Sequence, residues 1–377
     1  MAVADRPYRI IISGGGTGGH IYPAIAIAHA LQSLHPDTEI LFVGAQGRME
    51  MQKVPDAGYK IIGLWISGIQ RKLTLDNLAF PFKLISSLRK SSRIIKDFQP
   101  DAVVGVGGFA SGPLVYMASR KGIPSLLQEQ NSYAGLTNKI LADKVDRVCV
   151  AHEGMEQFFP ADKIVFTGNP VRKDIVSLAA QGLQHKRKEA FEFFELDPQK
   201  KTILVVGGSL GARTLNDSML AGISQVVARD AQLIWQCGKY YHREMSDKLN
   251  AVADKPGIKL HEFLSRMDLA YAAADVVISR AGALAISELA LVRKPTVFVP
   301  SPNVAEDHQR KNAESLVRQD AALMVTDAEA PARLIDAALG LLENEQQQQA
   351  LSENMKKIAR PDAAEHIAQE VLSLIKR

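Results

Sequence analysis

Seven residues near the start of the chain, Gly14 to His20, comprise five glycines, a threonine and a histidine. Glycine lets the backbone turn tightly and lets a ligand approach the main chain closely. A histidine side chain, with its ordinary pKa of about 6.5, suits proton transfer near neutral pH. The β-branched run Arg9–Ser13 before this segment predicts a buried strand, and an apolar pattern from Ala24 to Leu34 predicts a helix after it. Free N–H groups at the helix start favour a site for an anion or polar substrate, although a tight turn without a ligand also fits the pattern.

Two further glycine-rich segments follow strand-like runs. The first spans Val104–Pro113, and the second, Gly207–Ala212, follows the run Ile203–Val206 and precedes a helix expected from about Leu215. The second half of the chain therefore repeats the strand, glycine loop and helix with which the first half begins. This repetition predicts two domains built on one plan.

Size and composition limit the class of protein. The chain has 377 residues, enough for about two domains, and its net charge of +4 is too small to require a nucleic-acid partner. Its two cysteines, Cys149 and Cys237, form no CxxC pair, so neither a disulfide framework nor a zinc site is expected. The first eight residues do not read as a signal peptide, and no apolar run approaches the roughly 20 residues of a membrane-spanning helix. We expect a cytoplasmic protein whose membrane contact, if any, is peripheral.

Strand-like and helix-like segments alternate throughout, which predicts an α/β fold of two doubly wound parallel-sheet domains facing a cleft. We place the join near Gly168, where Asn169 and Pro170 favour an extended turn. The expected strands are Arg9–Ser13, Glu39–Gly44, Lys60–Leu64, Ala102–Val106, Ser125–Gln128, Arg147–Val150, Ile164–Thr167, Lys201–Val206, Gln232–Gln236, Lys259–Glu262, Val276–Ser279, Thr296–Pro300 and Ala322–Val325.

Four more polar motifs complete the pattern. They are Gln128–Asn131, Thr167–Arg172, Ser279–Glu288 and Asp307–Ala313. In this order and spacing, the glycine loops and these motifs resemble the MurG family of peptidoglycan N-acetylglucosaminyltransferases over nearly the whole chain. The resemblance implies a glycosyltransferase B fold and inverting transfer of N-acetylglucosamine from UDP-N-acetylglucosamine to lipid I, undecaprenyl-pyrophosphoryl-N-acetylmuramoyl-pentapeptide. It further implies an acceptor domain over residues 1–168, completed by a helix over 361–377, and a donor domain over 169–360.

Several residues suit a nucleotide-sugar donor. Ala283 and Leu284 would open a helix whose N–H groups face a pyrophosphate, and Glu288 could accept hydrogen bonds from ribose hydroxyls. Ser209 could donate to a phosphate, although a turn serine and a solvated glutamate are the ordinary alternatives. The resemblance assigns the other substrate contacts to Thr17, Gly18, Gly19, Asn131, Arg172, Leu264 and Gln309. Among these, Arg172 would lie on the nucleotide side, the Leu264 backbone would meet uracil, and Asn131 and Gln309 would address the transferred sugar.

The general base remains open between His20 and Glu129, with water or substrate positioning as a third possibility. Both residues are placed at the acceptor side by the resemblance. No DxD-type acidic pair indicates a metal, and no cofactor is expected. Leu264, Phe109 and Ala285 depart from the residues usual in the family, which are isoleucine, tyrosine and threonine, but none of these departures touches a central role.

The segment Leu73–Arg93 is the candidate membrane surface. Its apolar residues are flanked by six cations (Arg71, Lys72, Lys83, Arg89, Lys90 and Arg93) and include one acid, Asp76. This composition favours docking on anionic lipid at the cytoplasmic face of the bacterial inner membrane. The alternative is that Leu78, Phe82 and Ile85, at helical spacing, are core residues.

Three other functions compete with the transferase. A UDP-N-acetylglucosamine 2-epimerase would share the two-domain plan and the donor but would need no acceptor. A nucleotide-dependent oxidoreductase is weaker, because Glu39 follows the first glycine loop without the dinucleotide fingerprint. A membrane-associated scaffold would need no polar constellation.

Overall fold

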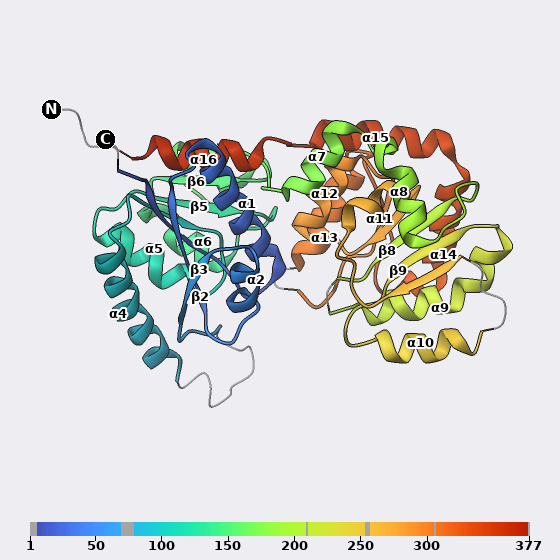
Figure 1. Ribbon diagram of the computed structural model, residues 1–377, viewed down its shortest axis with the longest axis horizontal. Helices are drawn as coiled ribbons and strands as arrows, with labels where there is room; N and C mark the ends of the chain where they lie inside the picture. The colour runs from blue at the N-terminus through green and yellow to red at the C-terminus, as the bar shows by residue number, and fades with distance from the viewer. Residues whose placement is uncertain (1–5, 69–78, 209, 253–256, 305–306, 376–377) are drawn as a thin grey trace. The chain divides into compact units, whose positions relative to one another are not determined.

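The computed structural model describes residues 6–68, 79–208, 210–252, 257–304 and 307–375. The chain divides into two compact units (Figure 1). Unit 1 comprises Met1–Arg172 and Arg360–Arg377, and unit 2 comprises Lys173–Ala359. The chain thus leaves unit 1 after Arg172 rather than Gly168, and it returns for a last helix.

Unit 1 contains a seven-stranded parallel sheet in the order β3-β2-β1-β4-β5-β6-β7. Its central pairing sets Ile11 of β1 beside Leu41 of β2 on one side and Val103 of β4 on the other. The strands are β1 (Arg9–Ser13), β2 (Glu39–Ala45), β3 (Lys60–Leu64), β4 (Ala102–Gly105), β5 (Ser125–Glu129), β6 (Arg147–Val150) and β7 (Ile164–Phe166).

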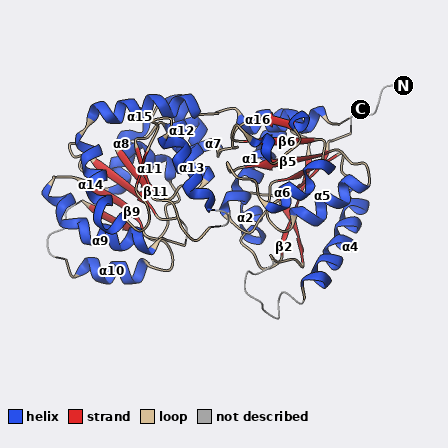
Figure 2. Cartoon of the chain, turned by 180° about the vertical axis from the view of Figure 1, so that it is seen from behind, coloured by secondary structure: helices blue, strands red, loops and turns tan. Residues whose placement is uncertain are grey.

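Helices cover both faces of this sheet (Figure 2). Successive side chains of a strand point to opposite faces. Ile10 and Ile12 therefore belong to one core cluster with residues of α1 and α16, while Ile11 belongs to another with residues of α4 and α5. The helices are α1 (Gly18–Leu34), α2 (Glu50–Asp56), α4 (Phe80–Phe98), α5 (Ser111–Arg120), α6 (Leu136–Leu141) and α16 (Ala363–Ser373).

The first helix begins earlier than expected. The pattern predicted a start at Ala24, but α1 starts at Gly18 and contains Pro23. Glycine and proline have the lowest helix propensities, so their presence obscured this first turn in the sequence. The consequence is functional, because His20 lies within the first turn of α1 rather than in the loop before it.

Unit 2 contains a six-stranded parallel sheet in the order β10-β9-β8-β11-β12-β13. Its strands are β8 (Thr202–Val206), β9 (Gln232–Gln236), β10 (Ile258–His261), β11 (Val276–Ser279), β12 (Thr296–Phe298) and β13 (Leu323–Met324). Its helices are α7 (Lys173–Gln181), α8 (Gln184–Phe194), α9 (Arg213–Ala228), α10 (His242–Asn250), α11 (Met267–Ala273), α12 (Ala283–Val292), α13 (His308–Val317), α14 (Ala330–Glu343) and α15 (Glu345–Ile358). The expected α/β class, with two doubly wound parallel sheets, is confirmed.

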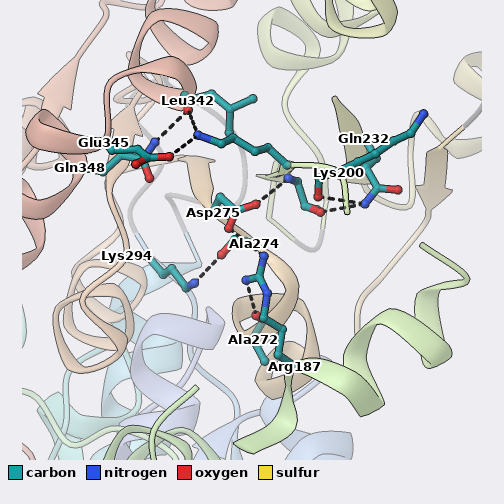
Figure 3. Close-up of polar contacts among 12 residues, drawn as sticks. Arg187, Lys200, Gln232, Ala272, Ala274, Asp275, Lys294, Leu342, Glu345 and Gln348 are labelled. Carbon is teal, nitrogen blue, oxygen red and sulfur yellow. Dashed lines mark hydrogen bonds and ion pairs between the residues drawn. The ribbon is translucent and has the colours of Figure 1, made fainter. Parts of the chain in front are cut away.

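An aspartate ties together the amino ends of the two central strands in each unit. In unit 2, Asp275 accepts the N–H of Thr202 at 2.8 Å and pairs with Arg187 at 2.9 Å (Figure 3). In unit 1, Asp101 accepts the N–H of Arg9 at 2.9 Å. Also in unit 2, Lys294 donates to the carbonyl of Ala274, the residue before Asp275. Burial lowers the pKa of Lys294 to about 8. These contacts fix the strand starts and leave the opposite, carboxyl ends for ligands.

No helix of the described residues is long and apolar enough to cross a membrane.

Candidate active site

The first candidate site lies at the carboxyl edge of the unit 1 sheet. Strands β1 and β4 are neighbours there, and the chain winds away from them in opposite directions. Loops that follow such a pair form the usual ligand crevice of a doubly wound sheet. The β1 loop contains the first glycine segment and the β4 loop contains Gly107 and Gly108, so two of the glycine segments meet at this point.

His20 is fixed between these two loops. Its Nδ1 lies 3.0 Å from the carbonyl oxygen of Gly15, and a Cβ added to Gly107 would lie 3.0 Å from its Nε2. Because a carbonyl only accepts hydrogen bonds, Nδ1 carries the proton and the lone pair of the neutral ring is on Nε2. Gly108 also lies close to the β1 loop, because a Cβ on Gly108 would come within 2.4 Å of the Gly15 carbonyl oxygen. Both glycines also have a positive φ, so side chains are excluded twice.

The first turn of α1 presents backbone N–H groups at its amino end. Thr17 is the N-cap residue, and its side chain makes no capping hydrogen bond. Its carbonyl accepts the N–H groups of His20 and Ile21. The N–H groups of Gly18 and Gly19, in the first turn, have no partner four residues earlier within the helix. The turn also carries no acidic residue, so its dipole favours an anion.

The Glu129 carboxylate, at the end of β5, accepts hydrogen bonds from the loop that follows and from α6. One oxygen accepts the backbone N–H and the side-chain amide of Asn131, at 3.1 and 3.3 Å. The other accepts the N–H of Gly135 at 3.0 Å and the amide of Asn138 at 2.9 Å. Glu129 is also buried. Through these four hydrogen bonds, Glu129 fixes the position of Asn131 and of the loop that contains it.

A buried amide network supports this loop from beneath. Gln128 donates to the Asn169 side chain at 3.0 Å, and Asn169 donates to the Gln130 carbonyl at 3.1 Å. Gln130 donates to the Val106 carbonyl at 2.8 Å, which connects the loops after β4 and β5. The sequence had pointed to these amides as part of motifs but had given them no role.

The second candidate site lies at the carboxyl edge of the unit 2 sheet. As expected, β11 ends at Ser279 and a helix, α12, opens at Ala283, with Leu284 in its first turn. Glu288 follows one turn later and accepts a hydrogen bond from the hydroxyl of Tyr271 at 2.9 Å. Tyr271 is buried on α11, and the sequence gave no sign of this contact. The arrangement provides helix N–H groups and an oriented carboxylate on one helix.

Two of the other residues expected to bind the nucleotide sugar, Leu264 and Gln309, follow strands of the unit 2 sheet. Leu264 is buried in the loop after β10. Gln309, in the first turn of α13, accepts the N–H of Ser301 at 2.9 Å, which orients its side-chain amide. Arg172 is the last residue of unit 1 before the chain crosses, whereas the sequence had grouped it with the donor domain. Ser209 lies outside the described residues.

Helix α4 presents one exposed face. Phe82 and Ile85 are 69% and 48% exposed, so the alternative that they are core residues is wrong. Leu78, with residues 69–78 as a whole, lies outside the described part of the chain. Arg89, Arg93 and Lys96 are exposed further along α4, at helical spacing from Phe82 and Ile85.

Two lysines expected on that face contact the protein instead. Lys83 is buried and donates to the Ser67 hydroxyl at 3.1 Å. Lys90 donates to the Gly63 carbonyl at 2.7 Å. The exposed basic groups of α4 are therefore mainly its arginines and Lys96.

Among the described residues, no group of three or more histidine, cysteine, aspartate or glutamate side chains is arranged to hold a metal.

Comparison with known proteins identifies both units. The glycosyltransferase family 28 N-terminal domain matches residues 10–150, and the C-terminal domain of that family matches residues 202–367. A UDP-N-acetylglucosamine–N-acetylmuramyl-(pentapeptide) pyrophosphoryl-undecaprenol N-acetylglucosamine transferase of Cytophaga hutchinsonii is 55% identical over 371 residues, covering 98% of each chain. The protein of the same name from Parabacteroides distasonis is 54% identical and covers 98% of this chain and 99% of its own.

Solved structures agree with this result. MurG of Acinetobacter baumannii superposes with a TM-score of 0.76 at 29% identity, covering 97% of this chain and all of the other. A UDP-GlcNAc 2-epimerase of Neisseria meningitidis gives 0.67 at 15% identity, covering 97% of this chain and 100% of its own, which shows a shared fold alone. The chain therefore belongs to glycosyltransferase family 28 and, within it, to the MurG family of N-acetylglucosamine transferases.

Proposed function

We propose that this enzyme transfers N-acetylglucosamine from UDP-N-acetylglucosamine to the O4 hydroxyl of lipid I, with inversion, to form lipid II in peptidoglycan synthesis. The observation that carries the proposal is the 55% identity, over 98% of both chains, to a relative named for this donor and this acceptor. The epimerase alternative is not favoured, because its structural likeness is accompanied by only 15% identity.

His20 is the proton acceptor in this proposal. Its Nε2 takes the proton of the acceptor O4 hydroxyl as O4 bonds to C1 of the donor sugar. The bond from C1 to the diphosphate oxygen breaks, and UDP leaves with the electron pair. The Nδ1–H contact to Gly15 supports this role, because it holds the ring with its lone pair on Nε2.

Unit 2 supplies most of the donor contacts and stabilises the leaving UDP. The N–H groups at Ala283 and Leu284 face the pyrophosphate, where helix termini favour negative charge. Glu288, oriented by Tyr271, accepts the ribose hydroxyls. Gln309 and Asn131 contact sugar hydroxyls, the Leu264 backbone contacts uracil, and Ser209 and Arg172 contact the nucleotide phosphates. Thr17, Gly18 and Gly19 contact substrate from unit 1.

Glu129 positions Asn131 rather than acting as the base. Its oxygens already accept four N–H bonds, and taking a substrate proton would disrupt that set.

The decisive assay uses labelled UDP-N-acetylglucosamine with and without a lipid I analogue. We expect UDP release and a disaccharide lipid only when the acceptor is present. Sugar epimerised without acceptor would instead assign the chain to the epimerases, and binding without turnover would favour a scaffold.

The same proposal requires contact with the cytoplasmic face of the membrane, because the acceptor's polyprenyl chain remains in the bilayer. The exposed face of α4 supports this contact: Phe82 and Ile85 can enter the interface while Arg89, Arg93 and Lys96 meet anionic headgroups. Each basic residue near such a surface contributes about 1 kcal/mol.

Replacing Arg89, Arg93 and Lys96 together by glutamine should release the protein from phosphatidylglycerol vesicles in a sedimentation assay at low salt. The matched control replaces Lys188, Arg229 and Arg333, three cations of unit 2 with the same total charge, and should sediment like wild type. Equal loss in both variants would mean that net charge, and not the α4 face, governs binding.

A further inference from the structure

A buried glutamate lies beneath the first glycine loop. Glu50 is the first residue of α2 and is fully buried. One carboxylate oxygen accepts the N–H of Gly16 at 2.9 Å, and the other accepts the N–H of Ala45 at 2.9 Å. Each carboxyl oxygen of Glu50 is thus held by a backbone donor.

Two glycines make room for this carboxylate. A Cβ on Gly15 would lie 2.1 Å from a Glu50 oxygen, and a Cβ on Gly44 would lie 2.5 Å from its Cγ. Neither position can therefore carry a side chain while Glu50 stays in place. The glycines of the loop thus serve an internal contact as well as an approaching ligand.

One peptide group connects Glu50 to His20. The amide between Gly15 and Gly16 donates its N–H to Glu50, and its carbonyl oxygen accepts Nδ1–H of His20 at 3.0 Å. An amide is a resonance system, so a negative charge at its N–H increases the electron density on its oxygen. Hydrogen bonds in such a chain strengthen one another.

We propose that Glu50 is a positioning residue for His20, acting through the Gly15–Gly16 peptide to hold the imidazole and to increase its basicity. The proposal rests on the proposed function, in which His20 accepts the acceptor's proton. The arrangement resembles a carboxylate–histidine pair with one peptide group between its members. No proton passes through the peptide; the carboxylate stabilises the imidazolium formed during transfer.

The Glu50 carboxylate contacts this peptide directly, through the N–H of Gly16. The other charged residues of α2, Lys53 and Asp56, pair with each other at the surface. Because Glu50 is fully buried, salt screens the field of its carboxylate only weakly.

The test measures His20 directly. Imidazole ¹⁵N–¹H correlation spectra of the full-length protein, with the His20 signals assigned by their loss in His20→Gln, give its tautomer and its protonation midpoint. We expect Glu50→Gln to lower that midpoint by about 0.5–1.5 pH units, because a negative charge has been removed. Turnover should fall about 10- to 100-fold, with the acidic limb of the pH–rate profile moved to lower pH and the Kd for UDP unchanged.

Asp101→Asn is the matched control. It neutralises a carboxylate that also accepts a backbone N–H in unit 1, but at the amino end of the sheet. We expect it to lower the melting temperature while leaving the His20 midpoint and the pH profile in place. A midpoint unchanged in folded Glu50→Gln would overturn the proposal.

Two further results keep this proposal separate from the proposed function. If His20→Gln retains full turnover while Glu50→Gln still lowers the His20 midpoint, the coupling stands and the role of His20 as proton acceptor fails. If Glu50→Gln does not fold, the wild-type spectrum decides: neutral His20 protonated on Nδ1 supports the contact, and protonation on Nε2 overturns it.

Discussion

The glycine loops after β1 and β8 occupy the same place in their respective sheets but have different supports. Beneath the β1 loop, the Glu50 carboxylate accepts the N–H of Gly16. Beside the β8 loop, the neutral Gln236 side chain donates to the Gly208 carbonyl at 2.9 Å, and the Gln236 backbone carbonyl accepts the N–H of Gly207 at 3.1 Å. A carboxylate favours a nearby group that becomes positive, such as an imidazole accepting a proton. A neutral amide avoids repelling a diphosphate, so each support suits the chemistry proposed for its unit.

The largest effect that this comparison predicts is on turnover through unit 1. His20→Ala should lower kcat by about 10²–10⁴-fold, or about 3–5 kcal/mol, because the proton acceptor is lost. The Kd for UDP, measured by calorimetry, should stay at the wild-type value, since the donor site is assigned mainly to unit 2 and His20 has no part in it.

Glu129→Gln provides the contrast within the same unit. An amide can still accept hydrogen bonds on one side, so turnover should fall less than in His20→Ala. If Glu129→Gln gave the greater loss and His20→Ala only a small one, the roles of the two residues would be exchanged.

Substitutions in the donor site of unit 2 should change the Kd for UDP rather than the rate of the chemical step. Glu288→Ala removes the charge-assisted hydrogen bonds to ribose, worth about 1.5–3 kcal/mol, so the Kd for UDP should rise about 10- to 100-fold. Tyr271→Phe, which removes only the hydroxyl that orients Glu288, should raise it less. An unchanged Kd in a folded Glu288→Ala protein would remove Glu288 from the donor site.

The last predicted effect concerns stability in acid and leaves both sites unchanged. Hydrogen bonds from Arg266, and then from Lys186, hold the pKa of the buried Asp268 carboxyl of unit 2 well below its usual range. A carboxyl with a depressed folded-state pKa stabilises fully above its unfolded value of about 3.9, and this stabilisation is lost as the pH falls below it. Asp268→Asn should thus cost about 1.5–3 kcal/mol of unfolding free energy at pH 7.

Urea unfolding of both proteins between pH 7 and pH 3 measures this contribution. The difference between wild type and Asp268→Asn should shrink toward pH 3. A difference that stayed constant with pH would mean that the substitution acts through packing and not through charge.

Central strands such as β1 and β11 could be predicted because they contain continuous apolar runs that are buried on both faces. The bounds expected from sequence are found for five strands, Arg9–Ser13, Lys60–Leu64, Arg147–Val150, Gln232–Gln236 and Val276–Ser279, and the other strands differ by one or two residues at one or both ends. Ala283 at the start of α12 was likewise predictable, since Gly282 separates it from a strand. In each case the pattern is local, so neighbouring residues carry the information.

The supports of the sites could not be predicted, because they come from distant parts of the chain. Glu50 reaches Gly16 only after α1, β2 and the loop that follows have returned the chain to the same edge. Tyr271 meets Glu288 from another helix. The cations of α4 could not be sorted from sequence for a similar reason. Lys83 is buried and Arg89 is exposed, and what distinguishes them is their position around the helix relative to the rest of unit 1.

The return of the chain to unit 1 at Arg360 makes unit 2 an insertion within unit 1. Both crossings lie in one neighbourhood of unit 1, since a Cβ on Gly168 would lie 2.5 Å from Cβ of Arg360. A chimera that exchanges unit 2 with a relative's therefore needs two splice points, after Arg172 and before Arg360. A single cut at the first crossing would transplant α16 with the wrong partner and remove Ile367 and Val371 from the core that also holds α1.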